Sequence, residues 1–154
     1  MLLNRLASSV LASVVILGSI GTTVINPSTA VAKPSGDSTQ LTAANIIATG
    51  TFVNVEQNHP TSGTARIINE NGKRYLEFEQ GFKTANGPEV KVILHRNNTV
   101  PVSVNEQDYV TLAPLQSTSG AQRYAIPDDW NLDQFKAVAI WCKRFNVTFG
   151  YASL

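Results

Sequence analysis

Turn-forming residues interrupt this sequence at short intervals from about residue 49 onward, and they limit what the chain can fold into. Between them lie seven strand-like runs, over about 49–56, 62–69, 74–80, 89–96, 109–113, 121–126 and 136–152. No segment shows the 3.6-residue apolar period of an amphipathic helix. Many short strands at such spacing are typical of an antiparallel sandwich or barrel. We predict an all-β fold, an antiparallel β-sandwich of about seven to nine short strands.

Two of the interruptions carry specific turn chemistry. Asn71-Gly72 stands between two strand-like runs, which strongly indicates a two-residue hairpin. The run after it alternates, so Leu76 and Phe78 are expected on one face of their strand. Asn86-Gly87 suits a left-handed turn, and Pro88 after it ends strand pairing. The sequence therefore predicts a tight hairpin and, further along, a break between two strands.

The last run is too long for one straight strand, and its pattern reverses in the middle. Val138, Ile140 and Cys142 share one parity, whereas the apolar residues that follow have the other: Phe145, Val147, Phe149 and Tyr151. One straight strand cannot bury both sets, because side chains alternate strictly between its faces. We therefore predict a bulge, a bend or a tight turn at Lys143-Arg144, with Cys142 as the last inward-facing residue before it.

The N-terminus is typical of an export signal. A start with one positive charge, Met1–Arg5, precedes an uncharged apolar stretch, and an Ala-x-Ala pattern ends at Ala32. This order predicts a secretory signal peptide over residues 1–32, a flexible linker over 33–45 and one folded domain over 46–154. The protein is then exported, to the periplasm, the extracellular space or the cell surface. The alternative is an uncleaved signal that anchors the chain in a membrane, because the apolar stretch is about long enough to span one.

Composition and spacing argue against several functions. The formal net charge is +1, so there is no basic surplus for binding nucleic acid. The glycines are scattered among turns and form no phosphate-binding loop. Structural zinc needs four ligands at characteristic spacing, and the chain lacks that pattern. These observations leave binding, redox and some hydrolytic functions open.

Cys142 is the only cysteine of the chain. Exported domains usually hold cysteines in pairs as disulfides. An unpaired one indicates a buried inert thiol, an intermolecular disulfide, a ligand or a reactive group. Activation of the thiol would need a nearby positive charge, and Lys143 points to the opposite face of a regular strand. The residues by themselves leave these alternatives open.

His59, His95 and Trp141 are the other residues that suggest chemistry. Both histidines together with Cys142 have the composition of a His₂Cys copper set, but the spacing after the cysteine disagrees, and no metal site is predicted. His95 alternates with the inward-facing residues of its strand, so it is expected at the surface. His59 lies in a turn-rich loop, either simply exposed or as a partner for a cofactor near Cys142. Trp141 has the parity opposite to Cys142 and is expected to be partly exposed, as core packing or as a stacking surface for a cofactor or sugar.

Four segments, in this order, resemble the electron-transfer DM-thirteen domain family. They are "TGTFVNVEQNHPTSGTARI", "YLEFEQGFKTANGPEVKVILH", "LAPLQSTSGAQRYAIP" and "FKAVAIWCKRFNVTFGYASL". The resemblance covers about residues 46–154. It implies a compact β-sandwich of the extracytoplasmic space with a redox or electron-transfer role, and in larger proteins the family accompanies DOMON and cytochrome-type modules. The proposed redox cysteine of the family corresponds to Cys142, and its histidine near the first strand corresponds to His59.

The leading hypothesis is an exported single-domain electron-transfer protein centred on Cys142, with His59 and Trp141 as candidate cofactor contacts. The residues name neither a cofactor nor a redox or surface partner protein. A single thiol can ligate a cofactor, form a mixed disulfide or cycle through sulfenic acid. The alternative is a non-catalytic binding or adhesion module in which Cys142 is only core packing. A third reading, a cysteine hydrolase, requires a histidine within hydrogen-bond reach of Cys142.

Overall fold

The computed structural model describes residues 44–154, so the predicted signal peptide (1–32) and nearly all of the predicted linker (33–45) lie outside the described residues. The described part contains nine strands: β1 (Asn45–Thr51), β2 (Val53–Asn54), β3 (Thr64–Glu70), β4 (Lys73–Phe78), β5 (Val90–His95), β6 (Tyr109–Pro114), β7 (Gln122–Ile126), β8 (Ala137–Cys142) and β9 (Val147–Ser153). Short 3₁₀ turns occupy Glu106–Asp108, Leu132–Gln134 and Lys143–Phe145. No helix within this part is long and apolar enough to cross a membrane.

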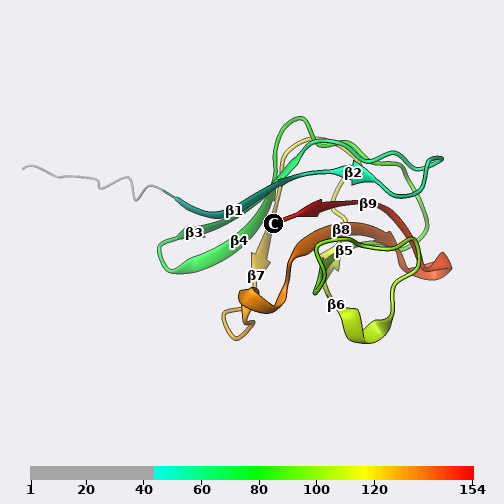
Figure 1. Cartoon of the computed structure of the whole chain (residues 1–154). Helices are drawn as coiled ribbons and strands as arrows, with labels where there is room; N and C mark the ends of the chain where they lie inside the picture. Colours follow the sequence, from blue (N-terminus) through cyan, green and yellow to red (C-terminus); the bar gives the residue numbers. More distant parts are fainter. Residues whose placement is uncertain (1–43) are drawn as a thin grey trace, which may run out of the picture. The chain divides into compact units, whose positions relative to one another are not determined.

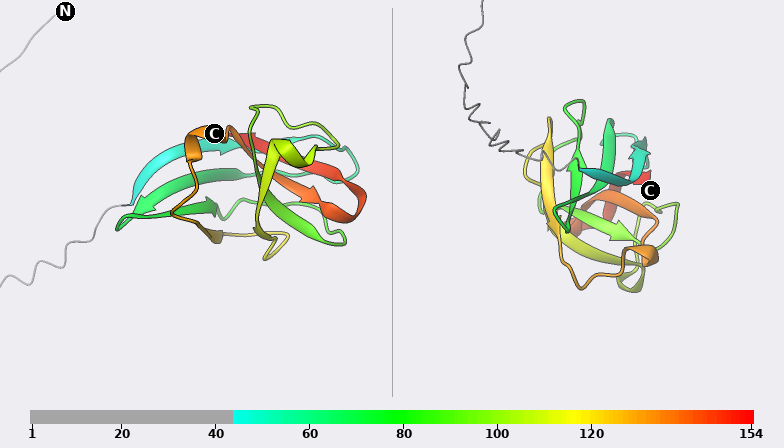
Figure 2. Two further views of the ribbon diagram at one scale, coloured as in Figure 1. Left: turned by 90° about the horizontal axis from the view of Figure 1, so that it is seen from below. Right: turned by 90° about the vertical axis from the view of Figure 1, so that its left-hand side faces the viewer.

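The strands form two antiparallel sheets that pack face to face, which confirms the predicted sandwich (Figures 1 and 2). The four-stranded sheet has the order β1-β3-β4-β7, and the five-stranded sheet has the order β2-β9-β8-β5-β6. Stacked sheets of this kind bury one face of each strand and leave the other toward solvent. Cys142 ends β8, near the middle of the five-stranded sheet.

The hairpin prediction is confirmed, whereas the second turn prediction is wrong in detail. Glu70 pairs with Lys73, so Asn71-Gly72 forms a two-residue turn, and both residues have positive φ angles, 53° and 80°. In the 86–89 segment the left-handed residue is Glu89, with φ 55°, rather than Asn86 or Gly87. The left-handed step therefore falls directly before β5 and two residues after the position expected for it.

Strand alternation correctly predicted the main core. Leu76 and Phe78 of β4 face inward, as do Tyr124 and Ile126 of β7. On the facing sheet the register aligns Val92 with Ile140, Leu94 with Val138, and Val90 with Cys142. Three phenylalanines from different segments meet at the centre, Phe52, Phe78 and Phe82, with ring centroids 4.5 to 5.4 Å apart. Cys142 therefore lies on the buried inner face of its sheet.

A second apolar cluster covers the outer face of the five-stranded sheet. It consists of Ile93, Val100, Val104, Ala137, Ala139 and Trp141, with Tyr109 and Tyr151 packed against it. The connection between β5 and β6 folds back over this face and supplies Val100 and Val104. The predicted face of the sheet is correct for Trp141 and His95, but the predicted exposure is wrong, because the two residues are only 4% and 1% exposed. A covering loop, which strand parity cannot indicate, removes both from water.

The predicted reversal after Cys142 is a tight turn, and a bulge follows it. Lys143–Phe145 forms a 3₁₀ turn, Asn146 takes a left-handed conformation with φ 50°, and the chain returns as β9. Phe145 was expected to face inward, and this is wrong, because it sits in the turn and is 64% exposed. Ile140 pairs with Gly150 and Trp141 with Thr148, which leaves Phe149 as an extra residue in β9. That bulge keeps Phe149 in the main core and moves Tyr151 to the outer cluster, against the predicted shared face.

Candidate functional site

The thiol of Cys142 is sealed beneath the segment that connects to β5. The residue is 1% exposed, and its Sγ donates a hydrogen bond to the Pro88 carbonyl at 2.9 Å. The backbone N–H of the next residue, Lys143, donates to the Glu89 carbonyl at 3.1 Å. Two successive carbonyls of this segment therefore hold the end of β8. Because the residue is 1% exposed, a reactant reaches the sulfur only when the packing around the end of β8 opens.

The 86–89 segment, which contacts the thiol, combines backbone strain with close packing. Glu89 holds a left-handed conformation, with φ 55°, at a cost of about 1–2 kcal/mol for a residue with a Cβ. Gly87 packs so closely that a Cβ built there would lie 3.0 Å from the ring of Phe149 and 3.2 Å from Val90. A cleft of about 210 Å³ adjoins the segment, and Gly87 and Val90 are among its lining residues. Strain, a tight glycine contact and an adjacent cleft therefore occur next to the covered thiol.

His59 lies over the same end of the molecule, at the bulge of β9. Its ring stacks on Phe149, with centroids 4.5 Å apart and planes 10° from parallel. The loop that carries it is tied to the bulge, because the amides of Val55 and Glu56 both donate to the Phe149 carbonyl, at 3.0 and 3.3 Å. The His59 side chain is 40% exposed. The histidine is thus fixed in orientation but open to solvent.

A carboxylate sets the orientation of the His59 ring. Nδ1 of His59 lies 2.5 Å from Oε2 of Glu56, and this hydrogen bond is the main reason that the pKa of Glu56 is lowered below its ordinary 4.5. Because Nδ1 carries the proton in that contact, Nε2 is the nitrogen that remains available as an acceptor or ligand. A carboxylate behind a histidine is also the usual support of a ligating imidazole. Glu56 is not among the residues predicted from the sequence, although its place three residues before His59 is consistent with the contact.

Phe149 is the structural link between His59 and Cys142. Its ring stacks on the imidazole of His59, and it belongs to the same core cluster as Cys142. The hydrogen bonds of the two functional groups go elsewhere, from Cys142 to Pro88 and between His59 and Glu56. The Cys–His contact that a cysteine hydrolase requires is therefore absent from the described residues.

Trp141 contributes structure on the opposite face of the sheet. Its Nε1–H donates to Oδ1 of Asn146 at 2.9 Å, and its ring packs 5.0 Å from that of Tyr109. Asn146 also accepts from the Val104 N–H at 3.0 Å and donates to the Val104 carbonyl at 3.1 Å. Burial raises the pKa of the Tyr109 phenol above its ordinary value. A stacking role for Trp141 would require the loop over the outer cluster to open.

Residues 44–154 bring no metal-ligand set together. No group of three or more His, Cys, Asp or Glu side chains within this range is arranged to hold an ion. His95 is buried on the outer face of β5, where its Nδ1 accepts from the backbone N–H of Asn97 at 3.1 Å. It thus lies on the opposite face of the sheet from Cys142. Of Cys142 and the two histidines, only His59 and Cys142 therefore lie at the same end of the sandwich.

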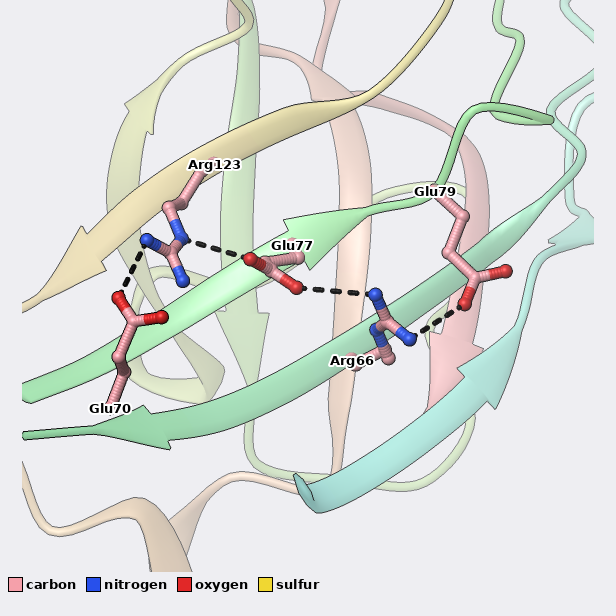
Figure 3. Close-up of polar contacts among 5 residues, drawn as sticks. All are labelled: Arg66, Glu70, Glu77, Glu79 and Arg123. Atoms are coloured by element: carbon pink, nitrogen blue, oxygen red, sulfur yellow. Dashed lines mark hydrogen bonds and ion pairs between the residues drawn. The ribbon is translucent and has the colours of Figure 1, made fainter. Parts of the chain in front are cut away.

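The solvent face of the four-stranded sheet carries a continuous ladder of opposite charges (Figure 3). Glu77 of β4 lies at its centre, with Arg123 of β7 at 2.8 Å on one side and Arg66 of β3 at 3.4 Å on the other. Arg123 continues to Glu70 at 3.0 Å, and Arg66 continues to Glu79 at 3.1 Å. Both guanidinium groups of the ladder are therefore paired with carboxylates. The neighbouring surface pocket, of about 590 Å³, has four of the five ladder residues in its lining, all but Glu70.

Comparison with known proteins gives one match. A family model described as "Electron transfer DM13" matches residues 51–154 of the chain. No curated protein and no solved structure matches it. The matched range contains both His59 and Cys142, together with all but the first strand.

Proposed function

The chain belongs to the electron-transfer DM13 family and has the redox role of that family in the coarse sense, and from this premise we propose that Cys142 is its redox thiol. We also propose that the protein works outside the cytoplasm, since residues 1–32 have the pattern of an export signal. The observation that carries the proposal is the place of the only cysteine. It ends a core strand, buried, with its Sγ hydrogen-bonded to Pro88 in the 86–89 segment, where Glu89 has a left-handed conformation.

The thiol would act in one of three ways once the 86–89 segment opens. In cofactor ligation, Cys142 would release its proton to solvent and the thiolate would hold a cofactor, with the Nε2 of His59 as a candidate second contact. In disulfide exchange, the thiolate attacks one sulfur of a partner's disulfide, a mixed disulfide forms, and the other sulfur leaves as a thiolate. In the third way, the thiolate attacks hydrogen peroxide, the O–O bond breaks, hydroxide leaves, and the sulfur is oxidised by two electrons to sulfenic acid.

A first prediction tests whether the sulfur is the redox group. Cys142→Ser should keep the fold, because a hydroxyl can also donate to the Pro88 carbonyl, and it should abolish thiol reactivity and any bound chromophore. The measurements are an absorption spectrum and metal analysis of the purified protein, and titration with an aromatic disulfide reagent before and after denaturation. A serine variant that retains full redox behaviour would show that Cys142 is only packing.

A second prediction tests the cover over the thiol. Gly87→Ala adds a Cβ that would lie 3.0 Å from the Phe149 ring, so the ring or the 86–89 segment must give by a few tenths of an ångström. The loosened packing should make the native thiol react faster, by about tenfold. Gly81→Ala is the matched control, because its added Cβ meets nothing within 4 Å. Equal native rates for the two variants would contradict a cover formed by this segment.

The 1% exposure of Cys142 favours a second candidate function, a binding or adhesion module without redox chemistry. In that case the cysteine fills the core and the loops around His59 and Asn86-Gly87 face a protein or sugar. A colourless, metal-free protein whose thiol reacts only after denaturation, in Gly87→Ala as well, would favour this function over the redox proposal.

A further inference from the structure

The turn that follows Cys142 presents an apolar side chain directly after two cations. Phe145 is 64% exposed, the largest exposed fraction among the large hydrophobic residues of 44–154. Lys143 and Arg144 precede it, both exposed, and the Arg144 guanidinium lies 5.9 Å from the centre of the Phe145 ring. Val102, also exposed, lies beside the turn, because its carbonyl accepts from the Thr148 N–H at 2.7 Å. We call Lys143, Arg144, Phe145 and Val102 the basic tip.

The fold holds the basic tip rigidly although it buries none of it. The side chain of Asn146 makes three hydrogen bonds, to the indole of Trp141 and to both backbone groups of Val104. Asn146 takes the left-handed conformation that reverses the chain, and the Lys143 N–H is bound to Glu89. An exposed aromatic on a fixed frame loses little conformational entropy when it is covered, which is the property of a binding anchor.

The charges around the basic tip are not neutralised within the described residues. Lys143 and Arg144 form no ion pair there, and neither does Lys91, which pairs in register with Trp141 on the same outer face. Two exposed carboxylates lie on the segments that hold the turn: Glu89, whose carbonyl binds Lys143, and Glu106, two residues after Val104. Neither is paired with a cation of the tip, so Lys143 and Arg144 remain unpaired within residues 44–154, beside an exposed phenylalanine. Such a surface complements an acidic partner with an apolar contact point.

We propose that the basic tip is the docking surface for an acidic electron-transfer protein. This inference rests on the proposed function, since Cys142 directly precedes the tip and a partner seated there lies next to the cover of the thiol. Electron-transfer complexes are small and transient, and they rely on complementary charge for fast association. An anionic membrane fits less well, because lipid recognition by charge uses clusters of about four to eight cations and the tip has fewer.

The test uses two electron-transfer proteins of opposite charge, acidic cytochrome b5 and basic cytochrome c, with the isotope-labelled chain observed by NMR. Cytochrome b5 should shift the amide signals of residues 143–146, with an affinity that falls about tenfold as salt rises from about 20 to about 200 mM. Cytochrome c should leave them unchanged. Shifts confined to other residues, no shifts with b5, or equal shifts with both proteins would overturn the proposal.

Matched variants separate the basic tip from net charge. A double variant, Lys143→Glu with Arg144→Glu, should weaken cytochrome b5 binding about tenfold or more, and Phe145→Ser should weaken it about threefold. Lys136→Glu, an exposed cation at the other end of β8, should change it less than about twofold. If Lys136→Glu weakens binding as much as the tip variants, docking at the tip is wrong.

Two further arms distinguish a membrane and a failed redox function. Vesicles containing phosphatidylserine that shift residues 143–146 while cytochrome b5 does not would replace the protein partner with a lipid surface and overturn the proposal. Cys142→Ser should dock like the unaltered chain, because the sulfur is buried. If the chain docks but shows no thiol chemistry, the proposed function is wrong and the docking surface is supported. If the thiol is reactive but the chain does not dock, the docking surface is wrong and the proposed function is supported.

Discussion

The charged ladder and the basic tip both display arginine on the surface, but they treat its charge in opposite ways. In the ladder, Arg66 and Arg123 alternate with three glutamates across the four-stranded sheet. At the tip, Arg144 has no carboxylate partner within the described residues and instead lies beside an exposed phenylalanine. A face whose charges are paired with one another has little electrostatic attraction left for a partner. Unpaired cations beside an apolar group keep that attraction. This difference is the reason that we propose docking at the tip and regard the ladder as a set of contacts within the sheet.

The two regions also differ in what holds them. The ladder consists of partly exposed ion pairs between side chains of adjacent strands, and pairs of this kind are each worth less than about 1 kcal/mol. The tip depends on the buried contacts of Asn146, which satisfy one indole and two backbone groups. Breaking a ladder pair should therefore disturb little, whereas removing the asparagine should disturb the turn and the outer cluster together.

The largest expected effect is from Asn146→Ala. The change leaves Trp141 Nε1 and both backbone groups of Val104 without partners and places alanine in a left-handed conformation, so the free energy of unfolding should fall by about 2–4 kcal/mol. Urea denaturation measures it. Asn146→Gly restores the backbone freedom alone and should recover about 1 kcal/mol. Asn58→Ala, which removes one exposed hydrogen bond, is the control and should change stability by less than about 0.5 kcal/mol. A similar loss for Asn58 and Asn146 would remove the special role of the turn.

A smaller effect is expected from Glu77→Gln at the centre of the ladder. It loses the charge that pairs with Arg66 and Arg123 but keeps the shape of the side chain, so the free energy of unfolding should fall by less than about 1 kcal/mol. The loss should shrink further in high salt, because these groups are partly exposed to solvent. Urea denaturation at low and high salt checks both statements. A loss as large as that of Asn146→Ala would mean that the ladder stabilises the fold as strongly as the contacts of Asn146 do.

The smallest effect is a pH dependence at the hairpin end of the same sheet. Lys73 hydrogen-bonds Asp128, and this contact lowers the pKa of Asp128 below its ordinary 3.8 and raises that of Lys73. The pKa of Asp128 is lower in the folded protein than in the unfolded chain. The contact therefore stabilises the fold at pH values above the pKa of the unfolded chain, and this stabilisation is lost as the pH falls through the pKa of the folded protein. NMR titration of the Asp128 carboxyl measures the shift. Lys73→Gln should return the pKa toward 3.8, and an unchanged pKa would show that the pair does not persist in solution.

Strand alternation predicted the main core well because it depends only on local geometry. Val138, Ile140 and Cys142 face inward as their parity requires, and the Asn71-Gly72 turn forms because both residues tolerate positive φ. The errors lie where a distant segment intervenes. His95 and Trp141 occupy the expected face, but the connection between β5 and β6 folds back over that face and covers them. Burial depends on what packs against a face, and periodicity carries no information about that.

The candidate site divides in the same way. The sequence pointed to Cys142 and His59 as its chemical groups and to the strand end as the place of the thiol. It did not indicate that the Pro88 carbonyl binds the sulfur, that Glu56 orients His59 or that Phe149 is a bulge residue beneath the imidazole. The contacts of Pro88 and Phe149 join segments far apart in sequence, whose approach depends on sheet pairing and on the closing of loops. The Glu56–His59 contact spans only three residues, but it depends on the conformation of an irregular loop.

By itself, then, the sequence determined that this chain is an all-β sandwich with one inward-facing cysteine at a reversal, because alternation and turn propensity act within a few residues. Only the tertiary structure decided that the thiol is covered, that Trp141 and His95 are buried and that Phe145 is presented to solvent. The physical reason is that exposure is a property of the space around a residue, and that space is filled by chain segments far away in sequence.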